Sequence, residues 1–438
     1  MLSQAESKRV IDRVLSATRA IKGAEALVRL ESSHEGNSRF AVNELTTSGD
    51  TEDQSITLQV QLGLRLAGSS VNQIDDAAID DLVQRTATMA RLAPENPELM
   101  PVLGAQRYAA IPGAVDGATS KLSPEARAKA AAAIIASADS AKVTIAGFFE
   151  HAHKSFALGS SAGLSAYHTW TSCGLSTTAR TTDGTGSGWA SAQSNRVADL
   201  DAAALARTAI DKATTSAQPR KLEPGRYTVV LEPAAVAELV SWMCYSLNAR
   251  GADEGRSFFT KNKPGTKLFP ETITLRSDAS DPTLGAMPFD GDGMPAPTAR
   301  WFDKGTLTAL AYTRFWAKKQ GKTATGYPNS WTLDGGTATR DELIKGVDKG
   351  VLITRFWYTR YLDPQTILIT GLTRDGTFLI EDGKITTPVN NFRFNESPIQ
   401  VLARCDGLSK LAAPTGGWMR TPALRTHEFN LASISEAV

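Results

Sequence analysis

The sequence lacks an excess of charge of either sign. It holds 47 lysine and arginine residues against 46 aspartate and glutamate residues, so its formal net charge is +1. A chain without a strong overall field does not attract nucleic acid or an anionic membrane by bulk electrostatics. We therefore expect neither nucleic acid nor a membrane among its partners.

Cysteine is scarce as well. Cys173, Cys244 and Cys405 are far apart and form no CxxC pair. Isolated thiols in odd number exclude a disulfide framework and are typical of a reducing compartment. The first residues have no apolar stretch like that of a secretory signal, and no run of about 18 apolar residues is present to cross a membrane. The predicted location is the cytoplasm.

The 438 residues that are present suffice for two domains with substantial cores. Residues 56–66 alternate apolar and polar side chains, which predicts a half-exposed strand of an antiparallel sheet. The predicted fold is α+β, with two domains that each hold a largely antiparallel sheet flanked by helices. A proline-bearing linker over 218–225 divides an N-terminal domain, 1–220, from a mainly β C-terminal domain, 221–438, which contains a helix over 233–247.

Local signals predict further elements of the N-terminal half. Ser123 has the residue type of an N-cap, and Pro124 suits the first turn of a helix over 123–138. Strands are expected over 24–30 and 39–45, and several more within 143–194, with a hairpin turn at 159–163. Other helices are expected over 3–21, 75–91 and 199–216.

A second hairpin is predicted near the C-terminus. Asp382-Gly383 is a dipeptide that favours a tight turn between two short strands. Asn391, Arg393 and Asn395 follow it and supply amide and charged groups. We interpret these three residues as candidates for contacts with an extended peptide held by strand addition. An edge hairpin with a solvated tail explains the same pattern.

Several segments resemble the TldD/PmbA (TldD/TldE) family of peptidase-related proteins, also labelled modulators of DNA gyrase. The likeness runs over most of the chain in the family's order. It is carried by SRFAVNEL at 38–45, PGRYTVVLEPAAVAELV at 224–240, DPTLGAMPFDGDGMPAPTARWFDKGTL at 281–307 and GTFLIEDGKITTPVNNFRFNES at 376–397.

The resemblance implies a metallopeptidase assembly. Members of the TldD type carry HExxxH on the helix after the "TVVL" strand and bind a catalytic zinc through it. That helix here reads EPAAVAELVSWMCYSLNAR and has no histidine, so the chain is similar to the TldE/PmbA type. The resemblance then implies a non-catalytic subunit that has no cofactor of its own. Its partners would be a TldD-like zinc peptidase subunit and an extended or unfolded peptide.

Two other hypotheses remain open. His151 and His153 share a strand face, and a hairpin at 159–163 would place His153 opposite His168. Three clustered imidazoles would make the chain a metal-binding enzyme in its own right. The other hypothesis is a homodimeric peptide-binding protein without an enzymatic partner. Cys405 and Cys244 are expected to be buried structural thiols.

Overall fold

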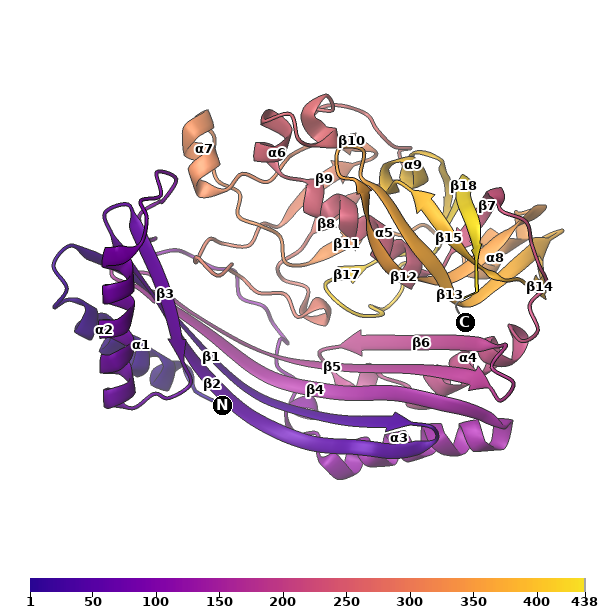
Figure 1. Ribbon diagram of the computed structural model, residues 1–438, viewed down its shortest axis with the longest axis horizontal. Helices are drawn as coiled ribbons and strands as arrows, with labels where there is room; N and C mark the ends of the chain where they lie inside the picture. The colour runs from indigo at the N-terminus through magenta and orange to yellow at the C-terminus, as the bar shows by residue number, and fades with distance from the viewer. Residues whose placement is uncertain (437–438) are drawn as a thin grey trace.

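Six long antiparallel strands dominate the N-terminal half of the chain. The computed structural model describes residues 1–436, and in it these strands form one curved sheet in the order β3-β2-β1-β4-β5-β6 (Figure 1). The strands are β1 (Ala24–Ala41), β2 (Glu44–Leu62), β3 (Arg65–Val71), β4 (Val143–Ser160), β5 (Ser165–Thr181) and β6 (Ser187–Ser194). Their antiparallel pairing, together with the helices described next, confirms the predicted α+β class.

The first of these strands corrects the sequence analysis. Two short strands were expected over 24–30 and 39–45, but β1 is continuous over 18 residues and pairs along its length with β2. The hairpin between them turns at Val42 and Asn43, which both have positive φ. The polar residues in the middle of β1 have weak strand propensity, so the sequence did not reveal a continuous strand. The strand forms nevertheless because it pairs with β2 on one side and β4 on the other.

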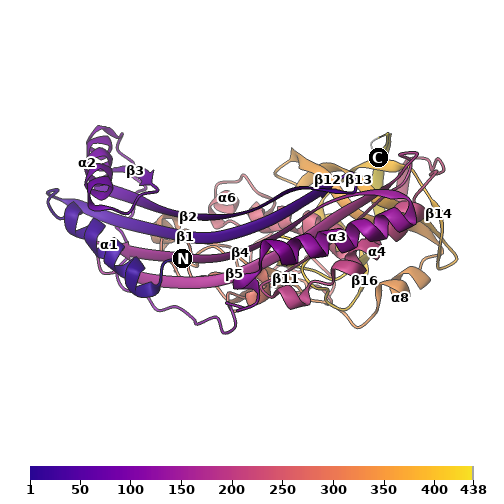
Figure 2. The same cartoon turned by 90° about the horizontal axis from the view of Figure 1, so that it is seen from below.

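Four helices cover one face of this sheet. They are α1 (Gln4–Thr18), α2 (Asp76–Leu92), α3 (Pro124–Ala141) and α4 (Ala202–Thr215). Apolar side chains of β1 and β2 pack against α1 and α2, and those of β4 and β5 pack against α3 and α4. Figure 2 shows α1, α3 and α4 lying along this helix-covered face. The Ser123 hydroxyl accepts a hydrogen bond from the Ala126 N–H, which confirms the predicted cap of α3.

Five strands of the C-terminal half close on themselves. In the order β12-β7-β18-β15-β13, each strand pairs with the next, and β13 pairs back to β12. Phe356, Phe394 and Phe429 come from three of these strands, are buried and contact one another. The five strands are β7 (Gly225–Leu231), β12 (Lys349–Asp363), β13 (Leu368–Glu381), β15 (Asn391–Glu396) and β18 (Leu424–Ser435). We call them the strand ring.

The remaining elements surround the strand ring. The predicted turn at Asp382-Gly383 joins β13 to the terminal strand β14, and both turn residues have positive φ. A second, five-stranded sheet has the order β10-β9-β8-β11-β17. Bounds not yet given are α5 (Pro233–Ser246), α6 (Ala249–Asp253), α7 (Arg314–Gln320), α8 (Arg340–Lys345), α9 (Pro398–Ala403), β8 (Leu275–Ser277), β9 (Ala299–Asp303), β10 (Thr306–Leu307), β11 (Trp331–Leu333), β14 (Lys384–Pro388), β16 (Cys405–Leu408) and β17 (Met419–Arg420).

Buried polar contacts join the long sheet to the strand ring. Lys212 of α4 forms an ion pair of 2.5 Å with Glu232, which is the N-cap residue before α5 and is 8% exposed. Ser187 of β6 donates a 2.5 Å hydrogen bond to Asp375, which is fully buried. Partners from both halves satisfy these groups, so the relative position of the two halves is fixed at this seam. Within residues 1–436, no helix combines the length and apolar character that crossing a membrane requires.

Candidate functional site

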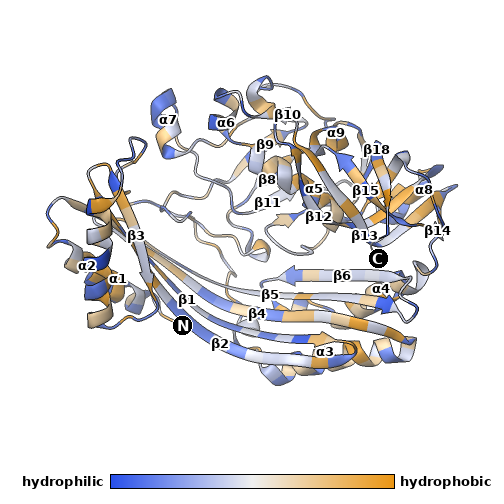
Figure 3. Ribbon diagram, in the orientation of Figure 1, coloured by the Kyte–Doolittle hydropathy of each residue, from blue (hydrophilic) through white to orange (hydrophobic). Residues whose placement is uncertain are grey.

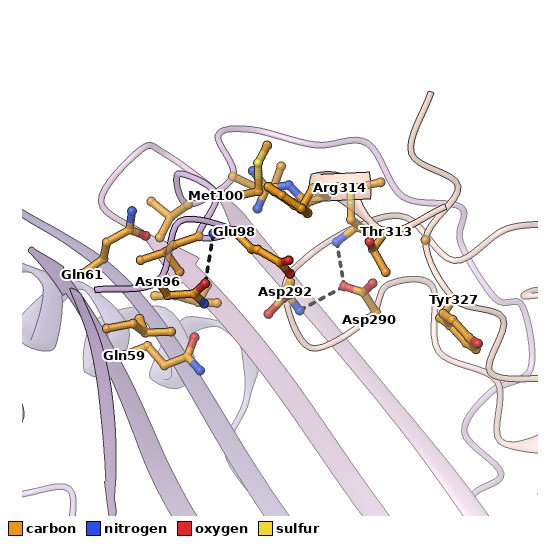
Figure 4. A pocket seen from close by; sticks show the side chains of 18 of the residues that line it. Gln59, Gln61, Asn96, Glu98, Met100, Asp290, Asp292, Thr313, Arg314 and Tyr327 are labelled. Atoms are coloured by element: carbon orange, nitrogen blue, oxygen red, sulfur yellow. Dashed lines mark hydrogen bonds between the residues drawn. The ribbon is translucent and has the colours of Figure 1, made fainter. Parts of the chain in front are cut away.

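Two adjoining cavities lie between the long sheet and loops of the C-terminal half. Their volumes are about 390 Å³ and about 640 Å³, and Asp290 and Tyr327 line both. Figure 4 shows the smaller one, with Gln59 and Gln61 of β2 on one side and the loop of Asp290 on the other. We call the two cavities together the sheet groove. Volumes of this size are typical of ligand sites.

The floor of the sheet groove is the face of the long sheet that the helices leave open. Side chains alternate along a strand, so Glu31, Ser33 and Glu35 of β1 share this face. The register places Asp53 of β2 opposite Ser33, and Lys154 of β4 opposite it on the other side. Long stretches of β1 and β2 are hydrophilic, as Figure 3 shows. The part of this face around Glu31, Glu35 and Asp53 is polar and exposed, whereas Leu27, Phe156 and Leu158 of the same face are buried in a small apolar cluster with Phe289.

The roof of the sheet groove is a turn around Asp290. Its Oδ1 accepts hydrogen bonds from the N–H groups of Asp292 and Met294, at 3.0 and 2.9 Å. Burial raises the pKa of Asp290, although these N–H groups lower it in part. Backbone N–H groups organise this carboxylate, so Asp290 stabilises the turn itself.

Side chains of β1 and of the loop after α2 hold the roof in place. The Arg29 guanidinium donates to the Gly291 carbonyl at 2.6 Å and to the Asp292 carboxylate at 2.9 Å. Tyr108 donates to the Gly293 carbonyl at 2.8 Å. At the rim, Arg250 makes a bidentate ion pair with Glu98, at 2.6 and 2.7 Å. Floor and roof are thereby held at a fixed separation, which is the condition for a preformed site.

The helix α5 approaches the groove at its C-terminal end. Tyr327, which lines both cavities, donates a long hydrogen bond of 3.5 Å to the carbonyl of Tyr245. The accessible side of α5 carries Glu238 and Trp242, whose side chains both bind the hydroxyl of Thr359. The opposite side of α5 is packed into the core around the strand ring, through Val236, Leu239, Val240 and Met243.

The residues at α5 do not fit a catalytic zinc. The helix has no histidine, and Cys244 is 1% exposed with a pKa that burial raises well above its usual range. Cys405 is also buried, and burial raises its pKa to about 12. Both thiols are therefore protonated at neutral pH, as predicted for structural cysteines. Across residues 1–436, no three histidine, cysteine or acidic side chains are grouped as metal ligands.

The alternative hypothesis of a three-histidine cluster fails on the register of β4 and β5. The hairpin at 159–163 forms, but β5 pairs Thr171 with His153, and His168 with Phe156. This register differs by three residues from the expected one, so His168 points to the opposite face of the sheet from His151 and His153. His168 stacks on Trp170, at 5.5 Å between ring centroids, on the face that bears the sheet groove.

His151 and His153 lie on the helix-covered face. His151 is 2% exposed, and its Nδ1 lies 3.2 Å from the guanidinium of Arg127 in α3. Burial lowers the pKa of His151, and the positive charge of Arg127 lowers it further. His153 Nε2 lies 3.2 Å from the Thr169 hydroxyl, and burial lowers its pKa too. The surroundings of both rings favour the neutral imidazole.

The three predicted peptide-contact residues lie on β15, which is one of the five strands of the strand ring. Because β13 and β18 pair with β15 on both sides, its backbone offers no free edge for strand addition. The Asn391 amide oxygen accepts from the hydroxyls of Thr373 and Thr377. Arg393 is exposed and donates to Thr370 at 3.3 Å, whereas the buried Oδ1 of Asn395 has no partner in residues 1–436. The free edge of this hairpin is β14 instead.

The sheet groove was not predicted from the sequence. Its floor and roof are 262 positions apart where Arg29 meets Gly291, and no local pattern joins them. One signal was available: acidic residues at 31, 35 and 53 share a face once β1 and β2 are read as a continuous hairpin. Their significance depends on a register that the sequence did not fix.

Three family models match successive parts of the chain. Their descriptions are PmbA/TldA metallopeptidase domain 1 for residues 26–90, the central domain for residues 118–217, and the C-terminal domain for residues 224–433. The fold and these matches define a peptidase-related α+β protein. The chain belongs to the PmbA/TldD family. No curated protein sequence matches it.

Solved structures agree with this fold. TldE from Thermococcus kodakarensis aligns with a TM-score of 0.88 and 16% identity, covering 97% of this chain and 100% of that one. A putative modulator of DNA gyrase from Bacteroides thetaiotaomicron aligns with a TM-score of 0.87 and 20% identity, over 99% and 100% of the two chains. Another, from Thermotoga maritima, gives 0.85 and 16%, over 97% and 99%. At these identities, the likeness shows the fold alone.

Proposed function

We propose that this chain is the non-zinc subunit of a two-chain metallopeptidase that cuts extended or unfolded peptides. The observation that carries the proposal is the composition of α5. Where the zinc-binding type of the family has HExxxH, this helix packs aliphatic side chains into the core and has no histidine. The thiol of Cys244 in the same helix is buried and protonated, so it supplies no replacement ligand.

In this proposal the chain contributes binding rather than bond cleavage. The sheet groove is large enough for a peptide segment and is lined by side chains of fixed position. A TldD-like partner supplies the zinc, which activates a water for attack on the peptide bond. The residues of this chain hold the substrate and exclude part of the solvent around it. The free edge of β14 is a second place where an extended segment would bind, by main-chain hydrogen bonds.

The state of the three cysteines indicates the cellular compartment of the proposed two-chain peptidase. Cys173, Cys244 and Cys405 are all free and buried. We propose the cytoplasm, because a protein without disulfides suits a reducing compartment.

Coexpression tests the proposal. The chain is produced with and without a family member that carries HExxxH, and both preparations are assayed on an unfolded, fluorescently labelled peptide. We expect a complex that cuts the peptide, loses activity with a chelator and regains it with zinc. Neither chain should cut alone at a comparable rate. Chelator-sensitive cleavage by this chain alone would overturn the proposal.

A second candidate function is peptide binding without an enzymatic partner. It is favoured by one observation: contacts of Arg29 and Tyr108 with the turn at 291–293 hold the floor and roof of the sheet groove together within this chain. Sedimentation of the purified protein distinguishes the two candidates. A homodimer that binds peptide and ignores the HExxxH protein would support this second function and exclude the first.

A further inference from the structure

The larger cavity of the sheet groove has an excess of negative charge. Glu31, Glu35, Asp53 and Asp290 line it, against Lys154 as the single cation. Lys154 is already engaged, with its Nζ 2.6 Å from the carboxylate of Glu35. The chain as a whole is almost balanced, at +1. The acidity of the groove is therefore a local property and not a reflection of overall composition.

Two of these carboxylates, Glu31 and Asp53, are exposed and lie at neighbouring positions of the floor. Glu31 lies opposite Ser55, and Asp53 lies opposite Ser33, so the two acids are diagonal neighbours on adjacent strands. Neither carboxylate has an ion-pair or hydrogen-bond partner among residues 1–436. Like charges at neighbouring positions destabilise a sheet. A cation placed between them would remove the repulsion and gain two favourable contacts.

The roof adds an acceptor that has no donor. Asn329 lines the same cavity, and its Nδ2 donates to the Met287 carbonyl at 2.7 Å, which fixes the orientation of the amide. Its Oδ1 is buried and has no partner in the described part of the chain. A buried acceptor without a donor is destabilising. Because this oxygen is enclosed, the acceptors that the groove presents directly to a ligand are the carboxylates of its floor, and a ligand that pairs with them must bring N–H groups.

Aromatic rings complete the lining. Phe156 of the floor and Phe289 of the roof stack, with 5.9 Å between centroids, and both are buried; the partly exposed Trp170 packs against them and offers the accessible ring. Lysine and arginine side chains combine an apolar stem with a cationic, donor-rich head. The stem packs on aromatic rings and the head pairs with carboxylates, and a cation near a ring face gains a further attraction.

We propose that the sheet groove selects extended peptides by their lysine and arginine side chains. The cationic heads bind between Glu31 and Asp53, and the aliphatic stems lie against Trp170. This inference rests on the proposed function only in taking the ligand to be a peptide. It adds the substrate class: basic segments are bound in preference to acidic ones.

Binding to the purified chain alone tests this inference. Three labelled, unstructured peptides of equal length are compared by fluorescence anisotropy: one rich in lysine and arginine, one with glutamate at those positions, and one with serine. The chain is studied as wild type, as E31Q/D53N and as the matched control E44Q/D211N. The control removes two exposed carboxylates that lie outside the groove and have no ion pair. Thermal melting checks that each variant is folded.

We expect the wild type to bind the basic peptide about tenfold or more tightly than the acidic one. E31Q/D53N should lower affinity for the basic peptide by about tenfold and leave the serine peptide unchanged, while E44Q/D211N stays within about twofold of wild type. Raising the salt concentration should narrow the preference, because the carboxylates are exposed. Equal binding of acidic and basic peptides, no binding of either, or equal loss in both double variants would overturn the inference.

A polyamine offers the same ammonium chemistry without a peptide backbone. Spermidine should displace the basic peptide only at concentrations about a hundredfold higher than unlabelled peptide, and equal potency would overturn the assignment to a peptide. The assay needs no partner and no cleavage. If the chain binds basic peptides selectively but the two-chain mixture does not cut, this inference stands and the proposed function is excluded. If the mixture cuts but the chain shows no preference for basic peptides, the proposed function stands and this inference is excluded.

Discussion

The two faces of the long sheet handle charge in opposite ways. On the helix-covered face, the fully buried Arg127 binds the Asp50 carboxylate at 2.6 Å and the carbonyl of Gly49 at 3.3 Å. On the groove face, Glu31 and Asp53 form no ion pair with any residue of 1–436, whereas Glu35 pairs with Lys154. Asp50 and Asp53 are three residues apart on β2, so their side chains point to opposite faces of the sheet. Asp50 therefore meets the buried Arg127, whereas Asp53 faces the groove without an ion-pair partner in residues 1–436. One face holds the fold together, and the other remains available to a ligand.

The largest effect should come from removing the buried cation. Arg127→Met leaves the Asp50 carboxylate without its partner and deprives His151 of a hydrogen bond. Because Arg127 is fully buried and the side chain of Asp50 is 29% exposed, breaking this pair should cost about 2 to 3 kcal/mol of unfolding free energy. Urea denaturation measures the loss. Arg85→Met, which removes an exposed pair with Asp81, is the control and should cost less than about 0.5 kcal/mol. Similar losses in the two variants would contradict the comparison.

A glycine makes room for the same buried group. A Cβ at Gly36 would lie 2.1 Å from Asp50, 2.3 Å from Arg127 and 2.4 Å from His151. We expect Gly36→Ala to destabilise the protein by about 2 kcal/mol, because overpacking forces these side chains apart. At Gly49 of β2, nothing lies within 4 Å of the added carbon, so Gly49→Ala should have little effect. A neutral Gly36→Ala would show that the cluster is loosely packed.

The groove face also holds a titrating group, His168. Burial lowers its pKa from 6.5 to about 4. The unfolded chain therefore binds a proton at higher pH than the folded chain does, and stability falls as pH drops from 6.5 toward 4. The expected loss is about 1 kcal/mol by pH 5.5. His168→Gln should flatten the pH dependence of the unfolding free energy in this window. An unchanged slope would show that His168 is not the group responsible.

The smallest change in unfolding free energy is expected for the groove carboxylate Asp53, and it compares the two faces of the sheet most directly. Asp53→Asn should leave the unfolding free energy unchanged or raise it by up to about 0.5 kcal/mol, because it relieves repulsion from Glu31. Asp50→Asn, three residues away, should lower it by about 1 to 2 kcal/mol, because Arg127 loses its anion. Parallel urea titrations compare the two variants. Equal destabilisation would mean that the groove carboxylates belong to the fold and not to a ligand site.

Local chemistry made several features predictable. The Ser123 cap, the Asp382-Gly383 turn and the helix after the "TVVL" strand depend on a few consecutive residues, and all three are found. The α+β class followed from the alternation in residues 56–66, although that run crosses the β2–β3 turn at Gly63. Such features need no knowledge of which distant segments meet.

Features set by distant pairing were not predictable. The register of β4 and β5 decides that His168 is separated from His151 and His153, and the two-sided pairing of β15 decides that Asn391 and Arg393 have no open edge. A shift of an odd number of residues moves every side chain to the other face. The sheet groove combines several such unknowns, which is why its carboxylates were read only as exposed polar residues.

The strand ring constrains how the protein is made. Its strands β7 and β18 are neighbours in space, yet about two hundred residues separate them along the chain. During synthesis β7 leaves the ribosome well before β18, so the edge of β7 that pairs with β18 stays unpaired until Leu424–Ser435 has been synthesised. An exposed margin of this kind is prone to aggregation. A nascent chain stalled before β18 should therefore depend on chaperones, and release of the last strand should end that dependence.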